Sequence, residues 1–167
     1  NYLFMATDYK KDPNYIAYLE NIVLALNLQI AQTQKGGEKF KIKKGGLLLS
    51  QSNLDMLPND DFIYGYLYGF VDISFQISEK YKDDRKAWLA AVAIIFSEFY
   101  GSELSGEVLK NCKVLLNTKE KFKKGCQLGG NEAKIFYHSG KSVVGLISYI
   151  RKNFEKYRRK FEKIAKN

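Results

Sequence analysis

Apolar residues recur at helical spacing near the start of the chain. Asp12 and Pro13 suit the N-cap and the first position of a helix, and Gly36–Gly37 suit its end. Between them one apolar stripe, with members three or four residues apart, runs through Ile16, Leu19, Val23, Leu26 and Ile30. The pattern therefore predicts a first helix from Pro13 to the glycine pair.

Two segments around this helix lack helical periodicity. Residues 1–11 precede it, and we expect them to be disordered or not native to the protein. From Glu38 onward the helical signal fades, and two short apolar runs flank Gly45–Gly46. Residues 38–50 therefore fit a small hairpin or an irregular loop.

The segment from Tyr64 to Tyr81 fits both a strand and a helix. Its second half alternates like a strand, whereas a helical face with Tyr66 and Phe70 spans the whole segment. No neighbouring segment offers a convincing partner strand, so the helix is favoured, beginning after a cap at Asn59 or Asp60. Gly65 and Gly69 each cost about 1 kcal/mol inside a helix, which predicts that another helix or a ligand approaches closely there.

Three further helices are expected before residue 142. Asp83–Asp84 cap a helix over Arg85–Tyr100, which Gly101 ends and which forms the core together with the helix from Asp60. Residues 105–124 predict the next helix, with Gly125 as its end. The stretch "CQLGGNEAKIFYHSGKS" is the least regular part, and a short helix from Asn131 is favoured over a strand there.

The carboxyl end predicts one long basic amphipathic helix over residues 142–166, with Ser142 as its N-cap. Four-three spacing is kept by Val143, Ile147, Ile150, Phe154, Tyr157, Phe161 and Ile164. The other faces beyond Ile150 are charged, so the basic half is expected to project past the body or to lie along it.

Together these elements predict an all-α fold, with residues 1–167 forming one helical bundle of five to six helices. The 46% hydrophobic and 14% aromatic content is too high for a disordered chain. No run approaches the roughly 20 apolar residues of a membrane span, so a soluble protein is expected. The first residues lack the pattern of a signal peptide, which favours the cytoplasm, although a signal removed before residue 1 remains open.

The net charge of +9 is concentrated at the carboxyl end. Residues 151–167 hold eight basic side chains against two acidic ones, and smaller basic clusters occur at Lys35–Lys44 and Lys119–Lys124. A field of one sign on one element favours acidic partners. The residues expected to bind the partner are Arg151, Lys152, Lys156, Arg158, Arg159 and Lys160.

Three kinds of acidic partner fit this charge pattern. An acidic protein is favoured, nucleic acid is the first alternative, and an anionic membrane surface is the second. Basic side chains suit nucleic acid, but no DNA- or RNA-binding signature accompanies them. The expected function is accordingly a non-catalytic binding module.

The motif "HSGKS" resembles a phosphate-binding loop only in part, because position 135 is Ile where that loop needs glycine. Gly140, Lys141 and Ser142 could still hold an anion at the start of the predicted last helix. Helix starts rich in Ser and Gly are more often simple caps, and that alternative stays open.

The cysteines and the histidine give little indication of a catalytic or metal site. Cys112 and Cys126 form no disulfide framework, and Cys112 among apolar neighbours is typical of a buried thiol, although a bridge between the two stays open. Cys126 with His138, the only histidine, is a conceivable thiolate pair. No metal-ligand spacing occurs, and we expect no catalytic residue, metal or cofactor.

A pocket wall is the last candidate site. Asp72 lies between Val71 and Ile73, and if buried it would need a partner or carry a raised pKa. The simpler alternative is that it faces solvent. The candidate wall residues are Gly65, Tyr68, Gly69, Asp72 and Glu98.

The pattern Gly65-Tyr66-x-x-Gly69-x-x-Asp72 resembles the glycine-containing helix of small helical immunity proteins, which neutralise secreted bacterial toxins. It spans eight residues, and the cysteines expected around such a helix are absent here. The resemblance implies a toxin inhibitor as a further alternative function.

Overall fold

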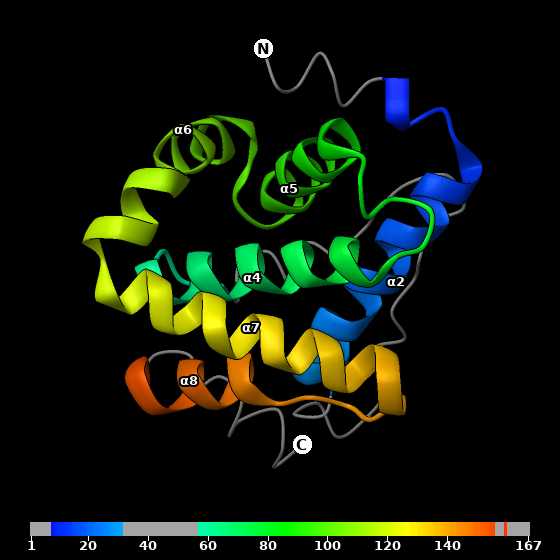
Figure 1. The fold of residues 1–167 in the computed structure, drawn as a ribbon. Helices are drawn as coiled ribbons and strands as arrows, with labels where there is room; N and C mark the ends of the chain where they lie inside the picture. The colour runs from blue at the N-terminus through cyan, green and yellow to red at the C-terminus, as the bar shows by residue number, and fades with distance from the viewer. Residues whose placement is uncertain (1–7, 32–56, 156–158, 160–167) are drawn as a thin grey trace.

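A computed structural model describes residues 8–31, 57–155 and 159 (Figure 1). All regular structure in these ranges is helical, which confirms the predicted all-α bundle. In chain order the helices of more than one turn are α2 (Pro13–Ala31), α4 (Asp61–Ile77), α5 (Arg85–Tyr100), α6 (Ser102–Thr118), α7 (Glu120–Ser139) and α8 (Gly145–Asn153). The α5–α6 pair covers one side of α4 and α7, and α8 lies on the other side (Figure 1).

Aspartate caps begin three of these helices, as the sequence predicts. Asp12 Oδ1 accepts the backbone N–H of Asn14 at 2.9 Å and begins α2. Asp60 Oδ1 accepts the Phe62 N–H at 2.9 Å, and Asp84 Oδ1 accepts the Ala87 N–H at 2.9 Å. Such caps satisfy backbone donors that have no partner within the helix.

The ambiguous segment is helical from Asp61 to Ile77, and its glycines explain why. A Cβ added to Gly65 would lie 2.0 Å from the Phe122 carbonyl oxygen, and one on Gly69 would lie 2.2 Å from that of Cys126. The two backbones therefore touch, and the expected close approach of another helix is confirmed. Both partner positions advance by four residues, so α4 and α7 run parallel.

The second helix of this pair supplies glycines of its own. A Cβ on Gly125 or on Gly129 would lie 2.1 Å from the carbonyl oxygen of Phe62 or Tyr66, respectively. The prediction that Gly125 ends a helix is therefore wrong, as is the short helix from Asn131. The break falls at Lys119, and α7 then continues for 20 residues. These glycines are typical of helix ends in the sequence. They lie within a helix here because the backbone of α4 occupies the space that a larger side chain at these positions would need.

The core lies between α4 and its neighbours. The largest fully buried side chains include Tyr15, Tyr66, Phe70, Phe75, Phe96 and Phe122. Tyr9 also belongs to this structure, since its ring lies 4.9 Å from that of Tyr15 and its hydroxyl donates to Asp84 at 3.3 Å. The expectation that residues 1–11 lie outside the fold is therefore wrong for Tyr9.

The last helix is shorter than predicted. Helix α8 begins at Gly145 rather than Ser142, and Phe154 is not helical. The uninterrupted helix over 142–166 is therefore wrong at both Ser142 and Phe154. The predicted hairpin at 38–50, the end of the first helix at Gly36–Gly37 and most residues beyond 155 lie outside the described residues.

Candidate functional site

Exposed cations from two helices meet at one end of the molecule. The parallel pair begins there, and α8 runs back so that its last turn reaches the same end (Figure 1). We call the following exposed residues the basic end: Lys119, Lys121, Lys123, Lys124, Arg151 and Lys152. The sequence shows the two clusters, but their proximity depends on the return of α8 along α7.

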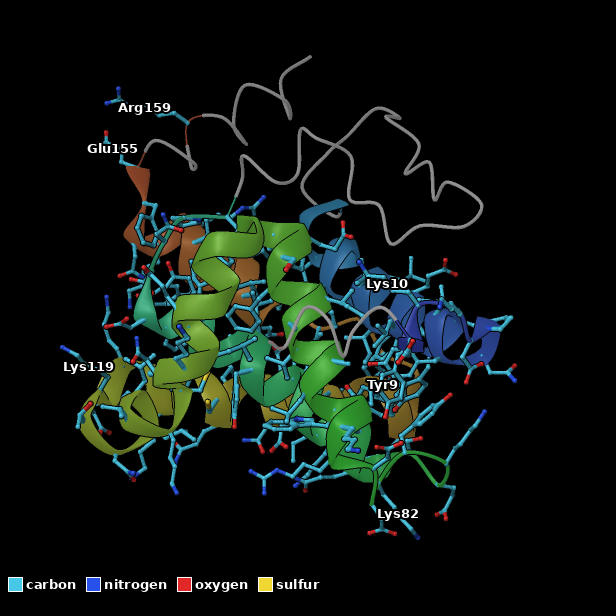
Figure 2. The ribbon with its side chains drawn as sticks, turned by 90° about the horizontal axis from the view of Figure 1, so that it is seen from above. Tyr9, Lys10, Lys82, Lys119, Glu155 and Arg159 are labelled. Atoms are coloured by element: carbon cyan, nitrogen blue, oxygen red, sulfur yellow. The ribbon has the colours of Figure 1, made fainter. Side chains whose placement is uncertain are left out.

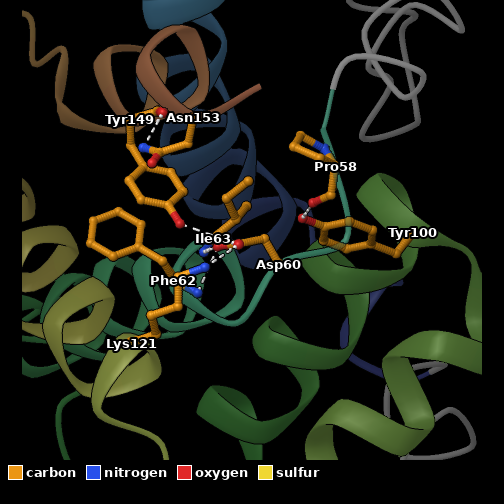
Figure 3. Close-up of polar contacts among 8 residues, drawn as sticks. All are labelled: Pro58, Asp60, Phe62, Ile63, Tyr100, Lys121, Tyr149 and Asn153. Atoms are coloured by element: carbon orange, nitrogen blue, oxygen red, sulfur yellow. Dashed lines mark hydrogen bonds and ion pairs between the residues drawn. The ribbon is translucent and has the colours of Figure 1, made fainter. Parts of the chain in front are cut away.

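Asp60 joins the helices that form this end (Figure 3). Its Oδ1 caps α4, while its Oδ2 accepts the Lys121 Nζ at 2.9 Å and the Tyr149 hydroxyl at 3.2 Å. The Asp60 side chain is only 8% exposed, whereas that of Lys121 is 62% exposed. The hydrogen bond to Asp60 raises the pKa of Lys121, so that lysine stays charged.

Aromatic stacking holds α8 in the same place. The rings of Phe62 and Tyr149 lie 3.9 Å apart and are nearly parallel, at 16°. The Lys121 Nζ lies 6.0 Å from the centre of the Tyr149 ring, within the range of a cation–π contact. The last turn of α8, with Arg151 and Lys152, is thus fixed beside the first turn of α7.

The other end of α8 is held by a buried polar network. Glu132 accepts the Tyr66 hydroxyl at 2.6 Å and the Gly145 N–H at 3.0 Å. Gln29 donates to the Tyr66 hydroxyl at 2.8 Å and accepts the Leu146 N–H at 2.9 Å. Gln29 of α2 and Glu132 of α7 therefore replace the local cap that α8 lacks, and Tyr66 of α4 connects the two.

The charge at the start of α7 works against helix stability. A helix N-terminus carries partial positive charge, and cations placed there are destabilising. Lys121, Lys123 and Lys124 nevertheless lie in its first turns, with Glu120 as the acid of the first turn. An arrangement that costs stability but concentrates positive potential suits the binding of an anionic group.

The predicted partner-binding residues divide into two sets. Arg151 and Lys152 are exposed at the end of α8, and Arg159 is exposed and pairs with Glu155 at 2.6 Å. Figure 2 shows Arg159, Glu155 and Lys119 on the same side of the molecule. Lys156, Arg158 and Lys160 lie outside the described residues.

The predicted anion site has a different geometry from the one expected. Gly140 ends α7 in the left-handed conformation, at φ 65°, and Lys141 and Ser142 are exposed before α8 begins. The N–H groups at the start of α8 that have no partner within the helix donate to the side chains of Glu132 and Gln29. Gly140, Lys141 and Ser142 therefore do not form the helix start on which the prediction depended.

The predicted pocket wall is only partly assembled. Gly65 and Gly69 are covered by α7, and Glu98 on α5 is not among the residues that line a described cavity. Tyr68 and Asp72 do line one cavity together, of about 350 Å³. Asp72 is half-buried, and this burial raises the pKa of its carboxyl.

The cysteines do not form the conceivable thiolate pair. Both thiols are free, and burial raises the pKa of Cys126 to about 12, the opposite of what a nucleophilic thiolate needs. His138 lies twelve residues further along the same helix, which corresponds to about 18 Å. No group of three side chains able to hold a metal ion occurs in the described part of the chain.

Sequence reasoning missed Gln29, Tyr66 and Glu132 as a set. Glu132 falls on the buried stripe of α7 that also carries Phe122, Gly125 and Gly129. An acidic residue on a buried stripe could have indicated this site. The predicted helix boundaries at Gly125 and Asn131 divided α7, so the stripe was not recognised.

Comparison with known proteins adds no relative. The chain matches no protein-family model, and searches of curated proteins and of solved structures find no match. Within the described ranges no helix is both long and apolar enough to cross a membrane.

Proposed function

We propose that this protein is a non-catalytic binding module that engages an acidic macromolecule, most favourably a protein, through its basic end and the basic residues that follow α8. The observation that supports the proposal is the meeting of the α7 lysines with Arg151 and Lys152 at one end. The predicted partner-binding residues Lys156, Arg158, Arg159 and Lys160 continue the same charge along the sequence.

The rigid attachment of the two helices favours a specific partner. Asp60, Tyr149 and Phe62 fix the last turn of α8 against α7, so the cations of both helices are held in one arrangement. Preorganised charges lose less conformational entropy on binding than charges on a flexible segment. Steering by such a field speeds association and weakens as salt is added.

The aromatic residues near the basic end favour protein over single-stranded nucleic acid. Single-stranded DNA and RNA are held largely by bases stacked on exposed aromatic rings. Phe62 and Tyr149 are half-buried and stack on each other, so their facing surfaces are already covered.

Fluorescence anisotropy with labelled polyanions tests the proposal. The probes are a poly-glutamate peptide, random-sequence DNA and RNA, and anionic vesicles measured by co-sedimentation. We expect the peptide to bind with a steep salt dependence. Reversing Lys123 and Lys124 to Glu, or Arg158 and Arg159 to Glu, should weaken binding at least about tenfold, or about 1.4 kcal/mol.

The matched control reverses Lys86 and Lys134, two exposed lysines outside the basic end, and should retain binding. Unfolding does not explain a loss in the Lys123→Glu, Lys124→Glu variant, because acids near the start of α7 favour the helix. Binding that is insensitive to salt, or that is lost equally in the control, contradicts the proposal. Binding of DNA or RNA without the peptide supports the nucleic-acid alternative instead.

A further inference from the structure

A second feature lies away from the basic end, between the later turns of α4 and the start of α5. The cavity of about 350 Å³ is bounded by α4, by the α4–α5 connection and by the first turn of α5. Tyr68, Asp72 and Gln76 follow one another at helical spacing on α4, while Arg85 and Trp88 face them from α5. Its size suits a small organic molecule.

Two opposite charges line this cavity without contacting each other. Asp72 accepts the Gln76 side-chain N–H at 3.0 Å, and in the described structure neither Asp72 nor Arg85 forms an ion pair. Tyr68 lines the cavity between them, and burial raises the pKa of its hydroxyl, with Asp72 adding to this rise and Arg85 opposing it. A carboxylate and a guanidinium thus flank a shared space.

Most other charges around the cavity already have partners. Asp84 caps α5 through the Ala87 N–H at 2.9 Å and accepts the Tyr9 hydroxyl at 3.3 Å. Lys82 pairs with Glu79 at 3.3 Å. Asp83 and Arg85 also line the cavity, and both are exposed to solvent, whereas Asp72 is half-buried. Arg85 is the lining cation without an ion pair in the described structure, and Asp72 is more buried than Asp83, so Asp72 and Arg85 are the pair best placed to take a ligand with both charges.

The remaining walls are aromatic and contain donors that are not in use. The rings of Tyr68 and Trp88 meet edge to face, at 5.7 Å and 86°. Tyr81 is 7% exposed, and its hydroxyl has no hydrogen-bond partner among the described residues. The Trp88 Nε1 is likewise buried without an acceptor in this part of the chain. Both donor atoms are shielded from solvent, so the surfaces that Tyr68 and Trp88 offer to a ligand are those of their rings.

We propose that this cavity binds a free amino acid with a large apolar side chain. The Asp72 carboxylate would accept the ligand's ammonium group, Arg85 would bind its carboxylate, and the rings of Tyr68 and Trp88 would contact its side chain. This site is independent of the basic end and does not require the acidic partner.

Trp88 is the only tryptophan in the chain, so its fluorescence reports directly on this cavity. Titration with L-phenylalanine and L-leucine should give a saturable change, with half-saturation at or below about 1 mM. Phenethylamine, which lacks the carboxylate, and 3-phenylpropionate, which lacks the ammonium group, should each bind at least about tenfold more weakly than phenylalanine.

Variants separate the two charges. Asp72→Asn and Arg85→Gln should each weaken phenylalanine binding at least about tenfold, while Lys86→Gln, an exposed neighbour that does not line the cavity, should not. Circular dichroism verifies that each variant is folded. The proposal is overturned if neither amino acid gives a saturable change, or if phenethylamine or 3-phenylpropionate binds as tightly as phenylalanine. It is also overturned if a folded Asp72→Asn or Arg85→Gln variant binds phenylalanine with unchanged affinity.

Discussion

Glu132 is a single residue on which the placement of a whole helix depends. It is 8% exposed and accepts hydrogen bonds from Tyr66, Val144 and Gly145. A buried carboxylate is stable only when its hydrogen-bonding capacity is met, and here the donors come from α4 and from the start of α8. The aspartate caps could be predicted from sequence because their partners lie two or three residues away. Glu132 could not, because its partners depend on the fold.

Replacing Glu132 with Gln should lower the free energy of unfolding by about 2 kcal/mol. The amide nitrogen cannot accept a hydrogen bond, so either the Tyr66 hydroxyl or the Val144 N–H loses its acceptor. Urea denaturation measures the change, with Glu120→Gln, an exposed site on the same helix, as the control. A loss no larger than that of the control would contradict the role given to Glu132.

The cysteines should be unreactive while the protein is folded. Burial raises the pKa of both Cys112 and Cys126 to about 12, so at about pH 8 roughly one thiol in ten thousand is ionised. Ellman's reagent should therefore react slowly with the native protein and rapidly in urea. Rapid modification of the native protein would show that the thiols are accessible.

At the level of elements, the parallel contact of α4 and α7 dominates the architecture. Each helix supplies two glycines on which an added Cβ would meet a carbonyl oxygen of the other helix. The sequence predicts close approach at Gly65 and Gly69 because these positions interrupt a clear apolar face. It does not predict the same at Gly125 and Gly129, because glycine in a polar segment is typical of a helix end. Only the position of α4 distinguishes the two cases.

Alanine substitutions should give opposite results at contact and non-contact glycines. Gly69→Ala and Gly125→Ala should each destabilise the protein by roughly 3 kcal/mol, because the added methyl group would force the two backbones apart. Gly106→Ala, on α6 with no atom within 4 Å of the added Cβ, should stabilise it by about 0.5–1 kcal/mol. Thermal unfolding measures all three variants. Equal changes in stability for Gly69→Ala and Gly106→Ala would contradict the backbone contact between α4 and α7.

At the scale of the whole molecule, charge and stability oppose each other at the basic end. The chain carries +9, and several of its lysines lie at the unfavourable end of α7. The sequence shows the amount of charge and its two clusters. It does not show that Asp60 and Tyr149 bring Lys121 beside α8, because that contact joins residues far apart in the chain.

Salt should therefore stabilise the fold while it weakens binding. Raising the ionic strength from about 0.01 M to about 0.15 M shortens the screening length from about 30 Å to about 8 Å. We expect the melting temperature to rise by about 2–4 °C, the equivalent of about 1 kcal/mol for a protein of this size. The Lys123→Glu, Lys124→Glu variant should gain less. A melting temperature that falls with sodium chloride would indicate that attractive ion pairs dominate.

The parallel pairing of α4 with α7 also bears on how the protein is made. Gly65 and Gly69 meet residues that the ribosome adds roughly sixty positions later, after the α5–α6 hairpin. At synthesis rates of about 5–20 residues per second, the surface of α4 at Gly65 and Gly69 is made roughly 3–12 seconds before the part of α7 that packs on it. Throughout that interval the nascent chain can form its individual helices, but the contact between α4 and α7 cannot yet form.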